Sequence, residues 1–100
     1  MTVSNTPSNL LARYRVLFSG DVQGVGFRYT TLQLARRYPT ITGYVRNLPS
    51  GQVSLVVEGK KTDIHQFLND IQNRFQGYIT ETETVPEPVT GEFSTFQINR

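Results

Sequence analysis

The stretch YRVLFSGDVQGVGFR occupies residues 14–28 and decides how the fold begins. Its first five residues place Tyr14, Val16 and Phe18 on one side of an extended chain, which predicts a strand over 14–18. Three of the eight residues that follow are glycines, a composition that suits a loop rather than the interior of a helix or strand. We therefore expect a strand, then a glycine-rich loop, then a helix that begins at about Phe27.

Two helices are predicted from apolar side chains that recur at helical spacing. The first covers residues 27–38 and is stopped by Pro39. The second begins after Thr62, the expected N-cap, and its apolar stripe runs from Ile64 to Phe75. Each helix has one apolar side, so each must pack against another layer.

Four more strands are predicted from apolar or alternating runs, at residues 41–47, 52–58, 78–85 and 93–99. The element order is β-α-β-β-α-β with one extra strand near the end, which is the split βαβ, ferredoxin-like arrangement. The expected fold class is α+β: a βαββαβ sandwich with two helices on one face of a four- to five-stranded, mainly antiparallel sheet. We expect residues 1–12 to form a flexible N-terminal tail and residues 13–100 to form one domain.

The composition excludes several classes of protein. The 100 residues include no cysteine and a single histidine, His65, which excludes a disulfide framework, a cysteine nucleophile and a multi-histidine metal site. No apolar run approaches the roughly 20 residues of a membrane span. The first nine residues lack the charged and apolar regions of a signal peptide, so we expect a cytoplasmic protein without a membrane partner.

Charge is distributed unevenly along the chain. Residues 1–50 carry six arginines and one acid, Asp21, a net charge of +5, whereas residues 51–100 carry four bases and seven acids, a net charge of −3. A positive half with one acid favours an anionic partner. A solvated surface with uneven charge is the alternative that this pattern leaves open.

The predicted topology brings two polar features to one edge of the sheet. The strands at 14–18 and 41–47 should run parallel with one strand between them, so the glycine-rich loop and Asn47 should lie roughly 10 Å apart. The loop and the first turn of the helix after it would present backbone N–H groups as an anion cradle. Arg28 in that turn opposes the helix dipole, a cost that a bound anion would offset. The loop lacks the lysine of a Walker A motif.

Each of these features also has a purely structural interpretation. A glycine-rich loop is often only a tight turn, and an arginine in a first helical turn is often only exposed. Asn47 precedes a turn that contains a proline, where asparagine commonly serves as a turn former. The residue pattern alone leaves both interpretations open.

The residues themselves resemble the acylphosphatase family. The resemblance rests on GDVQGVGFR at residues 20–28, followed by GYVRN at 43–47 and GQV at 51–53, and it extends from about Tyr14 to Arg100. It implies that residues 23–28 form the phosphate-binding loop, with Arg28 binding substrate and Asn47 orienting the attacking water. The implied loop residues are Gln23, Gly24, Val25, Gly26, Phe27 and Arg28. Two positions depart from the family pattern: Asp21, where the family often has a basic or polar residue, and Leu48, where some members carry threonine.

The resemblance implies hydrolysis of acyl phosphates to carboxylate and inorganic phosphate. No metal or other cofactor is expected, because the leaving carboxylate has a pKa of about 4 and needs no acid to protonate it. We expect a monomer with an acyl phosphate as substrate and inorganic phosphate as a product inhibitor.

Two alternatives come from other functional classes. The first is a module that binds an acyl or carbamoyl phosphate without efficient turnover, as in the acylphosphatase-like domains of larger hydrogenase-maturation proteins. The second is a nucleic-acid binder, since many RNA-binding domains share the βαββαβ order. Such domains place aromatic residues on a central strand. The run at 52–58 contains none, so we expect no nucleic-acid partner.

Overall fold

The protein is described here by a computed structural model that covers residues 10–100. The elements follow one another as β1 (Leu11–Gly20), α1 (Phe27–Ala35), β2 (Thr42–Asn47), β3 (Val53–Lys60), α2 (Lys61–Arg74), β4 (Ile79–Pro86) and β5 (Phe96–Asn99). This is the predicted order, including the extra strand. Residues 1–9 of the predicted tail lie outside the described part, and Leu11 and Ala12, assigned to that tail, belong to β1.

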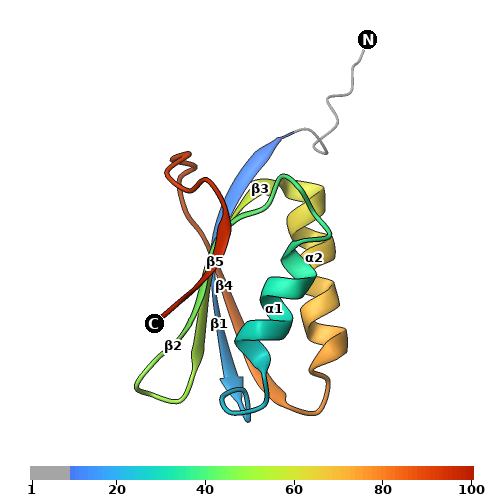
Figure 1. The fold of residues 1–100 in the computed structure, drawn as a ribbon, viewed down its shortest axis with the longest axis vertical. Coiled ribbons are helices and arrows are strands. Elements are labelled where there is room, and N and C mark those ends of the chain that lie inside the picture. The colour runs from blue at the N-terminus through green and yellow to red at the C-terminus, as the bar shows by residue number, and fades with distance from the viewer. Residues whose placement is uncertain (1–9) are drawn as a thin grey trace.

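The five strands form one sheet in the order β4-β1-β3-β2-β5. All neighbouring pairs are antiparallel except β2 and β5, which are parallel. Both helices cover the same face of the sheet, so the molecule has two layers (Figure 1). The predicted ferredoxin-like α+β sandwich is confirmed. Neither helix in the described range is long and apolar enough to cross a membrane.

The core lies between the sheet and the two helices. Val16 and Phe18 of β1 are fully buried there, as the alternation in this strand predicts. The ring of Phe27, the first residue of α1, lies between two others, 5.2 Å from that of Phe18 and 4.4 Å from that of Phe75. Burying a large apolar side chain contributes about 1.5–3 kcal/mol. Phe27 therefore fixes the start of α1 against the sheet.

Several predicted boundaries were wrong, among them the start of β5, which lies at Phe96 instead of residue 93. Helix α1 ends at Ala35 instead of Tyr38, because its end tightens into i→i+3 hydrogen bonds from Arg37 N to Leu34 O and from Tyr38 N to Ala35 O. Helix α2 is capped by Lys60, with no side-chain hydrogen bond, instead of by Thr62.

Strand β3 also differs from its predicted extent. It continues through Gly59 to Lys60, beyond its predicted end at residue 58. The added residues pair with the first residues of β1, which the prediction had left in the tail. Pairing with β1, which is distant in the sequence, thus outweighs the tendency of Gly59 to disfavour a strand.

The segment between β4 and β5 is held to the sheet by charged side chains. Arg13 donates hydrogen bonds to Glu87 and Glu92, and Arg15 donates a second one to Glu87. The buried carboxylate of Glu58 accepts hydrogen bonds from the backbone N–H groups of Thr90 and Gly91. These contacts fix the path of the chain into β5.

Candidate active site

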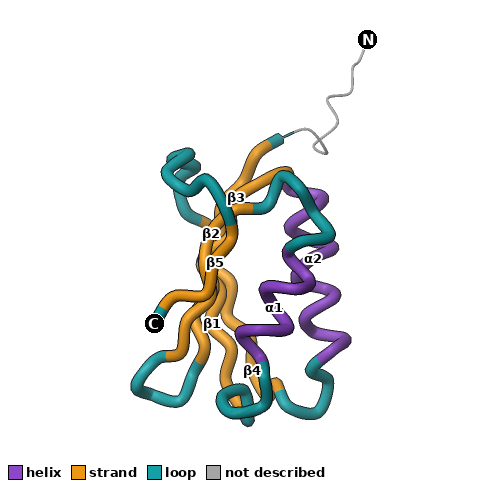
Figure 2. The backbone as a smooth tube through the Cα atoms, in the orientation of Figure 1, coloured by secondary structure: helices purple, strands orange, loops and turns teal. Residues whose placement is uncertain are grey.

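The glycine-rich loop and the β2–β3 turn lie at the same end of the sheet. Because β1 and β2 are each antiparallel to β3, they run parallel to one another, and their carboxyl ends meet at one edge. The backbone trace places the loop after Gly20 and the turn after Asn47 side by side at that edge (Figure 2). The predicted juxtaposition is confirmed.

The loop adopts a conformation that its glycines make possible. Gly24 and Gly26 have φ angles of +80° and +77°, in the left-handed region that residues with a Cβ atom rarely adopt. Gly26 is the N-cap of α1, which begins at the next residue. Among the described residues, the backbone N–H groups of residues 24–28 find no backbone acceptor. Free N–H groups of this kind, at the positive end of a helix dipole, attract anions.

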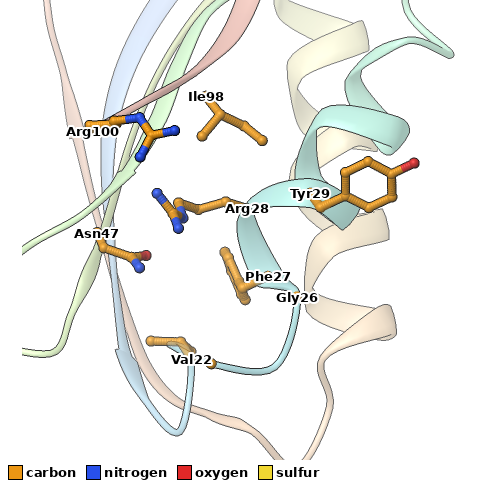
Figure 3. Close-up of a pocket in the computed structure, with 9 residues that line it drawn as sticks. Val22, Gly26, Phe27, Arg28, Tyr29, Asn47, Ile98 and Arg100 are labelled. Atoms are coloured by element: carbon orange, nitrogen blue, oxygen red, sulfur yellow. The ribbon is translucent and has the colours of Figure 1, made fainter.

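A cavity of about 490 Å³ opens between the loop and the sheet. Its lining residues are Val22, Gly24, Gly26, Phe27, Arg28, Tyr29, Asn47, Ile98 and Arg100. Arg28 reaches it from the first turn of α1, and Asn47 reaches it from the end of β2 (Figure 3). The structure therefore brings the two predicted catalytic residues to one cavity from two elements.

The side chain of Asn47 carries an unusual polar atom. Its Oδ1 is buried and accepts no hydrogen bond from any described residue. A buried acceptor without a partner costs about 1–3 kcal/mol. Because Asn47 lines the cavity, this buried oxygen lies at the cavity wall without a partner from the described residues.

Gln23 has a different place from the other predicted loop residues. Its Nε2 donates hydrogen bonds of 2.9 Å to the carbonyl oxygens of both Leu48 and Gln52 in the β2–β3 turn. The side chain of Gln52 in turn donates to Ser19 Oγ, at the end of β1, over 2.9 Å. The loop, the turn and the end of β1 are thus braced together by two glutamine amides.

Two predicted loop residues direct their side chains into the protein. Phe27 is 2% exposed and belongs to the core, and Val25 packs partly buried against the same core. These two residues can offer a ligand their backbone N–H groups, whereas their side chains belong to the core.

Neither of the two residues that depart from the family pattern lines the cavity. Asp21 is exposed, and the carbonyl oxygen of Leu48 accepts a hydrogen bond from Gln23.

The sequence prediction missed four lining residues: Val22 and Tyr29, which flank the predicted loop, and Ile98 and Arg100, which are distant from it in the sequence. Val45 of β2 pairs with Ile98 of β5, so residues 45, 47, 98 and 100 all fall on the helix-facing side of the sheet. The alternation of the last strand could have indicated which side they face. The alternation of residues in the last strand does not indicate, however, that β5 pairs with β2.

The cavity is electrostatically one-sided. Two arginines line it, and no aspartate or glutamate does. Within residues 10–100 no group of three or more histidines, cysteines or acids is placed to hold a metal ion. The site combines two guanidinium groups, free backbone N–H groups and one amide, which is a donor set for an oxyanion.

Fold and site together define a small α+β sandwich that carries a donor set for an oxyanion at the start of its first helix. The chain belongs to the acylphosphatase family, whose sequence pattern matches residues 14–98. The protein is accordingly an acylphosphatase-type hydrolase that acts on acyl phosphates.

Individual relatives agree with this assignment. An acylphosphatase of Methanospirillum hungatei is 41% identical over 91 residues, which make up 90% of this chain and 99% of the relative. The crystal structure of acylphosphatase from Bacillus subtilis matches with a TM-score of 0.80 at 28% identity, over 91% of this chain and 100% of that one. A probable carbamoyltransferase HypF of Methanocaldococcus jannaschii is 40% identical over 62 residues, 62% of this chain but 8% of that protein.

Proposed function

We propose that Arg28 and the backbone N–H groups of residues 23–28 bind the phosphoryl group of an acyl phosphate, and that Asn47 holds the water that attacks it. The observation that carries this proposal is that Arg28 and the unpartnered Oδ1 of Asn47 line the same cavity, which the glycine-rich loop closes on one side. An oxyanion bound by the loop and Arg28 leaves Asn47 facing it from the sheet.

Binding uses charge and geometry together. A guanidinium donates two parallel hydrogen bonds to phosphoryl oxygens, and such charge-assisted bonds are about twice as strong as neutral ones. The free N–H groups of the loop occupy fixed positions before substrate arrives, so they need no reorganisation during the reaction. The phosphoryl transition state is loose and spreads charge over its equatorial oxygens, which these donors stabilise.

Asn47 positions the nucleophile. Its Oδ1 accepts a hydrogen bond from the attacking water, and its Nδ2 donates to a phosphoryl oxygen. Water forms the new O–P bond while the bond from phosphorus to the carboxyl oxygen breaks. An amide is too weak a base to take the proton, so a phosphoryl oxygen accepts it. The products are a carboxylate and inorganic phosphate.

The leaving group explains why so few residues suffice. A carboxylate has a conjugate-acid pKa of about 4 and departs without protonation. The proposed mechanism therefore assigns no role to a general acid, a cysteine or a metal. Inorganic phosphate should occupy the same donors as substrate and act as a product inhibitor.

We propose that the enzyme acts as a monomer, because the proposed mechanism requires no residue from a second chain. We propose no nucleic-acid or membrane partner, and β3 carries no aromatic residue for base stacking. A cytoplasmic location stays a prediction from the sequence.

Hydrolysis of benzoyl phosphate tests the proposed function directly. Wild-type protein should release benzoate and phosphate over many turnovers, and Arg28→Ala should lower kcat/KM for this release by at least about 30-fold. Arg37→Ala is a matched control, because Arg37 is exposed and its one ion pair within residues 10–100 is with Asp70, at 3.9 Å. A near-normal rate in Arg28→Ala would contradict the assignment of Arg28.

The likeness to a HypF protein supports one alternative, a module that binds carbamoyl phosphate without efficient turnover. Calorimetry with carbamoyl phosphate, together with a phosphate-release assay, distinguishes the two functions. The enzyme should release phosphate continuously, whereas a binding module would give a stoichiometric heat signal and no phosphate.

A further inference from the structure

Arg100 is a second cation in the cavity, and it comes from an element far from the glycine-rich loop. Arg46 of β2 pairs with Asn99 of β5, so the next residues, Asn47 and Arg100, reach the same edge of the sheet. Both face the helices, by the alternation that buries Val45. In the close-up the guanidinium groups of Arg28 and Arg100 point into one space between β2 and α1 (Figure 3).

Neither guanidinium is neutralised by the protein. Within residues 10–100 Arg28 and Arg100 take part in no ion pair, whereas Arg13, Arg15 and Arg37 each do. No acid lines the cavity. Two like charges that share a cavity repel one another, and the repulsion is relieved when anionic groups enter. A phosphoryl group bound to Arg28 would thus leave the positive charge of Arg100 without an anionic partner.

The two arginines lie on different walls. Arg28 stands next to the loop that would hold the phosphoryl group, and Arg100 stands on the β5 wall beside the apolar side chain of Ile98. A phosphoryl group held by the loop and Arg28 directs the rest of the substrate toward the remaining lining residues. The β5 wall therefore offers a short apolar surface followed by a cation.

We infer that the enzyme prefers acyl phosphates whose acyl group carries a second anion, a carboxylate or a phosphate on a short chain, and that Arg100 binds that anion. This inference rests on the proposed function of the site. Arg100 acts on the acyl part of the substrate, so its contribution is to selectivity between acyl groups. A neutral acyl group contacts Ile98 alone.

A pair of substrates that differ in one charge tests the inference. Succinyl phosphate and butanoyl phosphate have acyl chains of equal length, and only the first carries a carboxylate. The readout is the ratio of their kcat/KM values, each corrected for uncatalysed decay. Wild type should favour succinyl phosphate, and Arg100→Gln should lower the ratio by about tenfold, as for one lost hydrogen-bonded charge contact. Arg100→Lys should retain part of the preference, since it keeps the charge and loses the planar fork.

Arg36→Gln is the matched control, because it removes one exposed positive charge about two helical turns from Arg28. For Arg36→Gln the ratio of kcat/KM between succinyl phosphate and butanoyl phosphate should equal that of wild type. An equal loss for both substrates in Arg100→Gln would overturn the inference and assign Arg100 to the phosphoryl group. An unchanged ratio with unchanged rates would overturn it as well. Absence of hydrolysis of both substrates by wild type would instead refute the proposed function on which the inference depends.

Discussion

The Nε2 atom of Gln23 lies 2.9 Å from the carbonyl oxygen of Leu48, the residue that directly follows Asn47. This contact spans 25 positions of the sequence and ties the glycine-rich loop to the strand end that carries Asn47. A second bond from the same nitrogen reaches Gln52 O, also at 2.9 Å. The Gln23 amide group thus links the loop directly to the strand end that carries Asn47, and the proposed mechanism depends on the separation between these two parts.

Substitution of Gln23 by glutamate tests this brace. Gln23→Glu keeps the size of the side chain but removes the Nε2 donor and leaves two carbonyl groups facing a carboxylate. We expect the free energy of unfolding to fall by about 1–3 kcal/mol and kcat to fall several-fold. Chemical denaturation and steady-state kinetics measure the two effects. Gln72→Glu is the control, because it removes an amide donor to Thr82 at an exposed position. Equal effects in both variants would refute a special role for Gln23.

Arg28 is expected to be essential for turnover but not for folding. Its side chain is half-buried and makes no hydrogen bond or ion pair within residues 10–100. Arg28→Ala should lose at least about 2–3 kcal/mol of transition-state stabilisation, a fall in kcat/KM of roughly 30- to 150-fold, with little change in melting temperature. Arg28→Lys should also be impaired, because an ammonium cannot reproduce the bidentate fork. Near-normal kinetics in either variant would remove Arg28 from the mechanism.

Substitutions of Asn47 should affect the affinity for phosphate and the value of kcat to different extents. Asn47→Ala removes the group that holds water, so kcat should fall by about a hundredfold while phosphate binds within a few-fold of wild type. Asn47→Asp keeps the oxygen but adds a negative charge beside the phosphoryl group and deletes the N–H donor, so both binding and rate should fall. Phosphate titration by calorimetry and initial-rate kinetics measure these quantities. A fully active Asn47→Asp enzyme would mean that this position acts as a base.

Inorganic phosphate should stabilise the folded protein and inhibit competitively. Its proposed binding donors are assembled only in the native state, so phosphate at a hundred times its Kd should add about 2.7 kcal/mol to the free energy of unfolding. The melting temperature rises by about 4–8 °C per kcal/mol for a domain of this size. Chloride at equal ionic strength should do much less, and EDTA should not change the rate. Equal shifts from phosphate and chloride would indicate general screening instead of a site.

Acid should weaken the attachment of the segment between β4 and β5. Hydrogen bonds from Arg13 and Arg15 hold the pKa of Glu87 below its ordinary value of 4.5. A carboxyl whose pKa is lower in the folded state stabilises the protein above its unfolded pKa, and this stabilisation is lost as the pH falls through the folded pKa. Glu87→Gln should therefore be less stable than wild type at pH 7, with a difference that shrinks below pH 4.5. Urea unfolding between pH 7 and pH 3 measures the difference. A constant difference across this range would contradict the role of this ion pair.

Local patterns in the sequence determined most of the architecture. Alternation and helical spacing predicted both helices and all five strands, because one side of each element must be buried. The glycines at positions 20, 24 and 26 indicated the loop, and all three have positive φ angles in the structure. The positions of Arg28 and Asn47 at one sheet edge followed from the element order alone, because two strands antiparallel to the same neighbour run in the same direction.

Tertiary structure decided what depends on pairing between distant segments. The strand β3 extends past Gly59 because β1 offers it a partner, and no local signal carries that information. The cavity gains Ile98 and Arg100 only because β5 pairs in parallel with β2 after a connection held by Arg13 and Glu58. Helical and strand periods are properties of neighbouring residues, whereas the register between strands arises from contacts that form across the whole chain. For this reason the sequence predicted that Arg28 and Asn47 come together, whereas only the fold placed Ile98 and Arg100 in the same cavity.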